Sequence, residues 1–154
     1  MRRVLKTLSV ICLLVAALPV SASAATGRVV KVLPHFLDLK GRHALTPSLY
    51  DRDAYQDYLR NHPQEVSGLR YDIKWKENGA NDARLKLQIE LRGDARGKTP
   101  VQTKLEKEIS SGSGRWTSLV LAGDDYKTFG KVTAWRATLW DGDQLLGEQK
   151  SFLW

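Results

Sequence analysis

The end of the chain, residues 132–154, constrains the fold more than any other stretch, because its pattern is typical of two strands joined by a tight turn. Apolar and polar side chains alternate through residues 132–140, which is the pattern of a strand with one buried face. The Asp-Gly pair at 141–142 is a strong short-range indication of a hairpin. We therefore predict a closing β-hairpin whose buried face carries Trp135, Ala137 and Leu139.

Two registers of this hairpin are compatible with the sequence. A two-residue turn sets Leu139 opposite Gln144, whereas a three-residue connection sets it opposite Leu145. The second register also brings Arg136 opposite Glu148 and so gives the better set of cross-strand pairs. A slip of one residue would reverse the faces of one strand, so both registers stay open.

The first residues are typical of a secretory signal peptide. A basic start precedes an apolar run over residues 8–20, and small residues follow at 21–25, as signal peptidase requires. The run is shorter than the roughly 20 residues that cross a bilayer, and it contains Pro19. We expect residues 1–24 to be removed, with cleavage after Ala24 or Ala25, and the mature protein to be periplasmic or extracellular with no transmembrane segment.

The mature chain would contain no cysteine, because the only one, Cys12, lies in the apolar run. This excludes disulfides, a thiol nucleophile and thiolate metal sites from the mature protein. Loss of three basic residues with the signal lowers the formal net charge from +7 to +4. The remaining 130 residues, 25–154, suffice for a single domain with an ordinary hydrophobic core.

The segment after the signal predicts an edge strand followed by a helix. Residues 29–40 have strand character interrupted at Pro34, which cannot donate a ladder hydrogen bond. Residues 49–61 predict a short helix, with Thr46 or Ser48 as its N-cap. Apolar residues recur every three or four positions along this helix, and we expect the stripe to pack on the sheet. The stripe consists of Leu49, Tyr50, Ala54, Tyr55, Tyr58 and Leu59, and its members Tyr50, Ala54 and Tyr58 are the natural cover for a tryptophan on the sheet.

From residue 69 onward the apolar period changes to two. Residues 69–76 and 85–91 alternate between apolar and polar side chains, as strands with one buried face do. Residues 101–109 and 116–122 predict two more strands, and residues 123–130 a helical turn before the closing hairpin. With the edge strand and the hairpin, the total is seven strands.

Residues 116–154 resemble the last three strands of an immunoglobulin-like or fibronectin type III-like sandwich, with Tyr126 near the corner that such folds pin with a tyrosine. Trp75 would be the core tryptophan. The resemblance implies a mainly β fold, namely a single antiparallel immunoglobulin-like β-sandwich of about seven strands, with one short helix inserted between the first two. That helix and the lack of a cysteine pair depart from the pattern, and the resemblance implies no function.

The residues that most often carry chemistry have no catalytic or metal-binding spacing. The three histidines, His35, His43 and His62, stand beside prolines or in turn regions. The acidic residues of the helix are explained by the helix dipole, and the Asp-rich turns by turn chemistry. We therefore predict no catalytic residue, no metal and no cofactor.

Aromatic and basic side chains offer a candidate binding surface instead. Trp135 and Trp140 lie on opposite faces of one strand, so Trp140 points away from the core unless the helix covers it. Basic residues are frequent on the polar faces of two strands that we expect to be neighbours, where they could form a positive stripe, although acidic residues interrupt them. Export argues against nucleic acid as the partner. The expected partner is therefore a protein or a polysaccharide. The candidate binding surface consists of Trp140, Arg70, Lys74 and Lys86.

These observations favour an exported, non-enzymatic β-sandwich module for binding or scaffolding. One alternative is a small carbohydrate-active or hydrolytic enzyme whose carboxylates come from separate loops. Another is an outer-membrane-associated β protein, because the terminal Trp154 resembles an assembly signal, although Lys107 would then face lipid. We also expect residues 152–154, three large apolar side chains, to belong to the folded core.

Overall fold

The computed structural model describes residues 25–80, 85–94, 101–112 and 114–154, so the predicted signal peptide lies outside the described residues. The predicted strands, the helix at residues 49–61 and the helical turn are all present. The elements are β1 (Thr26–Asp38), α2 (Leu49–Asn61), the short helix η1 (Pro63–Glu65), β2 (Val66–Asn78), β3 (Leu85–Gly93), β4 (Val101–Glu108), β5 (Arg115–Ala122), α3 (Gly123–Phe129), β6 (Val132–Asp141) and β7 (Gln144–Lys150).

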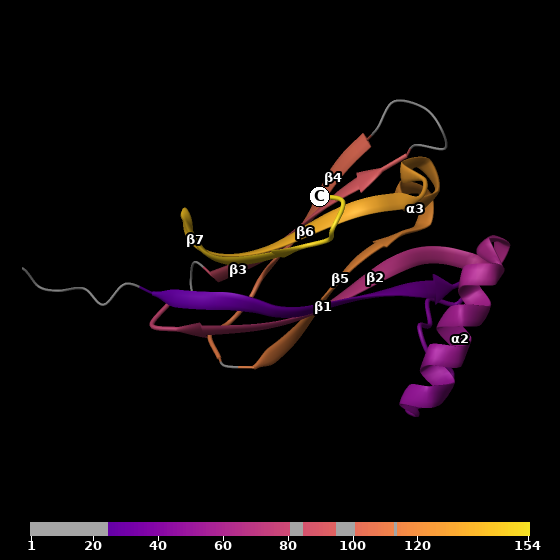
Figure 1. Cartoon of the computed structure of the whole chain (residues 1–154), viewed down its shortest axis with the longest axis horizontal. Coiled ribbons are helices and arrows are strands. Elements are labelled where there is room, and N and C mark those ends of the chain that lie inside the picture. The colour runs from indigo at the N-terminus through magenta and orange to yellow at the C-terminus, as the bar shows by residue number, and fades with distance from the viewer. Residues whose placement is uncertain (1–24, 81–84, 95–100, 113) are drawn as a thin grey trace, which may run out of the picture.

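The described strands form two antiparallel sheets. One contains three strands in the order β1-β2-β5, and the other contains four in the order β4-β3-β6-β7. Helix α2 lies between β1 and β2 in the sequence and at one end of the three-stranded sheet in space, far from the β6–β7 turn (Figure 1). The predicted mainly β, antiparallel fold with an inserted helix is therefore confirmed.

Alternation in β2 and β3 produces the core. Tyr71, Ile73 and Trp75 of β2 are at most 1% exposed, and Leu87 and Ile89 of β3 are fully buried. Because these strands belong to different sheets, a single hydrophobic cluster joins the two sheets. Burial of each such side chain contributes about 1.5–3 kcal/mol to stability.

The sheets approach each other most closely where β1 passes β7. A Cβ atom at Gly147 of β7 would lie 2.7 Å from the Cα atom of Arg28, and one at Gly27 would lie 2.9 Å from Cδ2 of Leu139. At Gly147 the obstructing atoms belong to the backbone of β1, so glycine there permits the close contact of two backbones.

Helix α2 begins at the predicted alternative cap, since the Ser48 hydroxyl accepts a hydrogen bond from the backbone N–H of Asp51 at 3.3 Å. The prediction for its packing face was right for Tyr55 and Leu59 and wrong for the other members of the stripe. Tyr50 is 83% exposed and Tyr58 41% exposed, whereas Leu59 is fully buried. The buried side of the helix consists of Arg52, Tyr55, Gln56 and Leu59. No helix in the described part of the chain is long and apolar enough to cross a membrane.

The polar residue Gln56 explains why the helix packs through this side. Its Nε2 donates to the carbonyl oxygens of Phe36 and His43, at 3.0 and 2.8 Å, and its Oε1 accepts from the N–H of Phe36 at 2.7 Å. The Tyr55 hydroxyl donates to Asp38 at 2.8 Å. The helix therefore satisfies backbone groups along edge strand β1, which an apolar stripe cannot do.

The closing hairpin forms, but in neither of the two registers predicted for it. Asp141 pairs with Gln144 across a two-residue turn, and an irregularity then sets Leu139 opposite Gly147. Gly142 has φ of 58°, the left-handed conformation that such a turn requires. The turn thus lies one residue later than the Asp-Gly pair suggested.

The last three residues do not join the core, contrary to the prediction. Phe152 is fully exposed and Leu153 is 69% exposed. The Trp154 ring instead lies beside two guanidinium groups, with the Arg92 Cζ atom 4.0 Å and the Arg136 Cζ atom 5.1 Å from its centroid. The end of the chain therefore covers the outer face of the four-stranded sheet.

Candidate functional site

The outer face of the three-stranded sheet carries an unusual group of polar side chains. Alternation turns Tyr71 and Ile73 of β2 into the core and leaves Arg70 and Asp72 on the other face. The register places Asp72 beside Ser118 of β5, and Arg70 beside His35 of β1. Residues far apart in the sequence are thus brought together by strand pairing.

These side chains form a cleft of about 390 Å³, here called the Asp72 cleft. Its floor is the sheet, and one wall comes from the segment that leads into helix α2 and from the first turn of that helix. The cleft is lined by Leu33, His35, His43, Arg52, Arg70, Asp72, Trp116 and Ser118.

Asp72 is the centre of the polar network in the floor. Its Oδ1 accepts hydrogen bonds from the Ser118 hydroxyl at 2.5 Å and from Nε of Arg70 at 2.8 Å. Its Oδ2 lies 3.2 Å from Nδ1 of His35. Burial alone would raise the pKa of the Asp72 carboxyl, but the contacts with His35, Ser118 and Arg70 outweigh it and hold the pKa well below its usual range.

Two imidazoles lie side by side at the cleft. The rings of His35 and His43 have centroids 5.4 Å apart. His35 is only 7% exposed, and within the described residues its Nδ1 makes no hydrogen bond that meets geometric criteria, although Asp72 lies 3.2 Å away. Burial lowers the pKa of His43, and the positive charge of Arg70 lowers it further. Both effects favour neutral His43.

The order of the groups differs from that of a catalytic triad. In a serine nucleophile system the imidazole stands between the hydroxyl and the carboxylate and removes the hydroxyl proton. Here the carboxylate of Asp72 stands between Ser118 and His35, so the hydroxyl donates to a carboxylate with a low pKa. The arrangement orients Ser118 and the Arg70 side chain but does not activate a nucleophile.

Trp116 forms the rim of the cleft. It is 49% exposed, although it belongs to β5, whose Leu119 and Leu121 are buried. The Lys74 ammonium lies 5.8 Å from its ring centroid. The site therefore combines a half-exposed aromatic surface with a floor of fixed polar groups.

The structure divides the predicted binding surface between two sheets. Arg70 lines the Asp72 cleft, and Lys74 lies beside it over Trp116. Lys86 and Trp140 pair with each other on the four-stranded sheet. Trp140 is half-buried, and its indole N–H donates to Thr138 at 2.8 Å. It is the next-to-last residue of β6, and helix α2 lies at the end of the molecule opposite the β6–β7 turn (Figure 1).

Sequence reasoning missed His35, Asp72, Trp116 and Ser118 as members of a site. One observation would have indicated part of it. Alternation of buried Leu119 and Leu121 in β5 places Trp116 and Ser118 on the opposite, outward face. The meeting of these residues with His35 depends on the pairing of β1 with β2, which no local pattern reveals.

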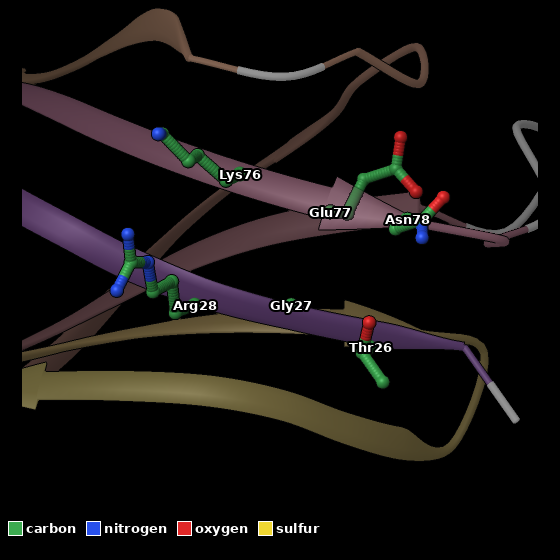
Figure 2. Close-up of a pocket in the computed structure, with 6 residues that line it drawn as sticks. All are labelled: Thr26, Gly27, Arg28, Lys76, Glu77 and Asn78. Atoms are coloured by element: carbon green, nitrogen blue, oxygen red, sulfur yellow. The ribbon is translucent and has the colours of Figure 1, made fainter.

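A second hollow lies at the ends of β1 and β2 but lacks such a network. Figure 2 shows that Arg28 and Lys76 extend away from Glu77, so the charged groups do not converge. Glu77 itself accepts hydrogen bonds from the backbone N–H groups of Ala80 and Gly112 and thereby fixes two loops. We therefore regard this hollow as structural.

The described residues contain no group of three or more side chains arranged to hold a metal ion. No protein-family model, curated protein or solved structure matches the chain. The geometry of the Asp72 cleft is thus the main basis for a functional proposal.

Proposed function

We propose that the protein is an exported, non-enzymatic β-sandwich module of the immunoglobulin-like, fibronectin type III-like kind, and that it binds polysaccharide through the Asp72 cleft. The strand orders β1-β2-β5 and β4-β3-β6-β7 support the sandwich assignment, since fibronectin type III-like domains divide their strands in this way. The core shared by the two sheets supports it too. Export rests on the predicted signal peptide at residues 1–24.

The observation that carries the binding proposal is the half-exposed Trp116 above a floor of fixed polar groups. An indole presents a large, rigid apolar surface, against which the C–H faces of a sugar ring can pack. Fixed hydrogen-bonding groups beside it supply orientation and specificity. This combination fits a saccharide better than a flat, mainly apolar protein surface.

The hollows around Trp116 suit a ligand that is a polymer. A hollow of about 440 Å³ along residues 43–52 shares His43 and Arg52 with the Asp72 cleft. Another of about 410 Å³ beside β5 shares Trp116 and Ser118 with it. Both hollows thus adjoin the Asp72 cleft, and the three together would accommodate successive sugar units.

Binding is favoured over hydrolysis because each of the hollows described above has at most one lining carboxylate. Asp72 stands alone in its cleft, and Glu108 stands alone in the hollow beside β5. Glycoside hydrolysis ordinarily uses two carboxyl groups about 5–9.5 Å apart, one of them able to act as an acid. The lowered pKa of Asp72 makes it unsuited to donate a proton.

Titration calorimetry tests the proposal, with a neutral glucan, a neutral xylan and polygalacturonate as probes. We expect at least one to bind the mature protein, and Trp116→Ala to weaken that binding about tenfold or more. Trp140→Ala is the matched control, because it removes an indole from the other sheet. Retention of binding in Trp116→Ala, loss of binding in Trp140→Ala, or no binding of any probe would each contradict the proposal.

A further inference from the structure

We infer that the Asp72 cleft selects an acidic saccharide and that Arg70 holds its carboxylate group. This inference deepens the proposed function and rests on it. The inference depends on a comparison of two sets of polar groups in the cleft. One set already makes hydrogen bonds within the protein, and the other faces outward.

The only carboxylate that lines the cleft is turned inward. Both oxygens of Asp72 contact protein groups, and its side chain is 14% exposed. Asp72 is therefore poorly placed to accept hydrogen bonds from sugar hydroxyls. A site for neutral sugars would normally offer such acceptors as well as donors.

The Arg70 guanidinium offers hydrogen-bond donors that remain available in the cleft. Nε of Arg70 donates to Asp72, and within the described residues its terminal nitrogens Nη1 and Nη2 make no hydrogen bond. The side chain is 33% exposed, so this edge of the guanidinium is accessible from the cleft. Because Nε is fixed by Asp72, the direction of the free edge is fixed as well.

The charge balance of the cleft is positive. Among the described residues, the charged groups of its lining are the cations of Arg52 and Arg70 and the single anion of Asp72. Arg52 also contacts Asp53, whose side chain is 69% exposed and does not line the cleft. Lys74 adds a positive charge at the rim, beside Trp116. An anionic ligand is therefore complementary to the site.

The form of the free Arg70 edge favours carboxylate. Two coplanar N–H groups match the two oxygens of a planar carboxylate. A phosphate group is usually held by additional backbone N–H donors, as at helix N-termini, whereas the strands under the cleft use theirs in the sheet. Because Trp116 and Arg70 line the same cleft, the site suits a uronic acid, whose sugar ring and carboxylate are joined in one unit.

The test compares an oligogalacturonide with its methyl ester, which has the same ring but no charge. We expect the mature protein to bind the free acid at about 0.15 M salt, where surface charges are screened beyond roughly 8 Å. The ester should bind about tenfold more weakly, as the loss of a charge-assisted pair predicts. Equal affinity for both, or tighter binding of a neutral glucan or xylan, would overturn the inference but leave the proposed function standing.

Substitutions of basic residues test whether Arg70 is the residue that binds the carboxylate of the saccharide. Arg70→Gln should abolish the preference for the free acid, whereas Arg70→Lys, which keeps the charge but not the planar fork, should retain part of it. Lys76→Gln is the matched control, since it removes one positive charge from the same strand outside the cleft. An equal loss in Lys76→Gln and Arg70→Gln would show that net charge alone attracts the ligand and would refute the inference. Melting curves confirm that each variant is folded.

Discussion

At the residue scale, two aspartates accept the hydrogen bonds that connect polar side chains on and beside the three-stranded sheet. Asp72 joins three strands through His35, Arg70 and Ser118. Asp38, 4% exposed, ends β1 and accepts hydrogen bonds from the backbone N–H and the guanidinium of Arg42. Neither role was visible in the sequence, because an isolated aspartate at a strand end and another in an alternating strand are both common on solvated surfaces.

The acid stability of the protein should report on these two groups. Burial would raise the pKa of Asp38, but the N–H and guanidinium of Arg42 and the Tyr55 hydroxyl lower it to about 2, and the pKa of Asp72 is lowered too. Because the folded-state pKa values lie below the unfolded values, this stability is present above about pH 4 and is lost as the pH falls through the folded pKa.

We therefore expect the free energy of unfolding to decrease between about pH 5 and about pH 2.5, with Asp38 contributing on the order of 1 kcal/mol after allowance for the solvent exposure of Arg42. Urea denaturation at both pH values measures this. Asp38→Asn should flatten the decrease, and Asp57→Asn, whose side chain is 67% exposed, should not. An unchanged pH dependence in Asp38→Asn would contradict the assignment.

At the element scale, helix α2 shows which structural features local sequence patterns can predict and which they cannot. Its bounds and the Ser48 cap follow from local rules of capping and periodicity. Its packing face does not, because the helix lies against the backbone of edge strand β1 and not on an apolar surface. The buried Gln56 and the exposed Tyr58 are consequences of that position.

Substitutions in α2 should distinguish the two packing faces. Gln56→Ala leaves three backbone groups of Phe36 and His43 without their partners, and we expect it to lower the free energy of unfolding by about 2–3 kcal/mol. Tyr58→Ala should cost less than about 1 kcal/mol, because this side chain is 41% exposed. Chemical denaturation of both variants measures the difference, and the reverse order of losses would show that the helix packs through its tyrosines.

The end of the chain should also be less important for stability than its apolar character suggests. Trp154→Ala removes the contacts with Arg92 and Arg136 and should cost about 1 kcal/mol. Phe152→Ala is its control and should change the melting temperature little, because Phe152 is fully exposed. Loss of folding in Phe152→Ala would restore the view that the terminus belongs to the core.

At the scale of the whole molecule, alternation and turn residues predicted the strands, their antiparallel arrangement and the place of the helix. The hairpin register was not predictable, because the irregularity between Leu139 and Trp140 shifts the pairing without altering the alternating pattern. The same limit applies to the site. Arg70 and Lys74 were correctly grouped as neighbours on one face, whereas Lys86 and Trp140 were assigned to the same surface although they lie on the second sheet.

The central claim is that the outer face of the three-stranded sheet, around Asp72, is the binding surface. The most direct measurement is an NMR titration of the mature, isotope-labelled protein with an oligogalacturonide, in which each backbone amide reports on its surroundings. We expect the largest chemical-shift changes at the amides of Leu33 and His35 and of residues 70–74 and 116–118, together with the Trp116 indole N–H. Changes centred on Lys86 and Trp140 of the other sheet, or no localised change at saturating ligand, would contradict it.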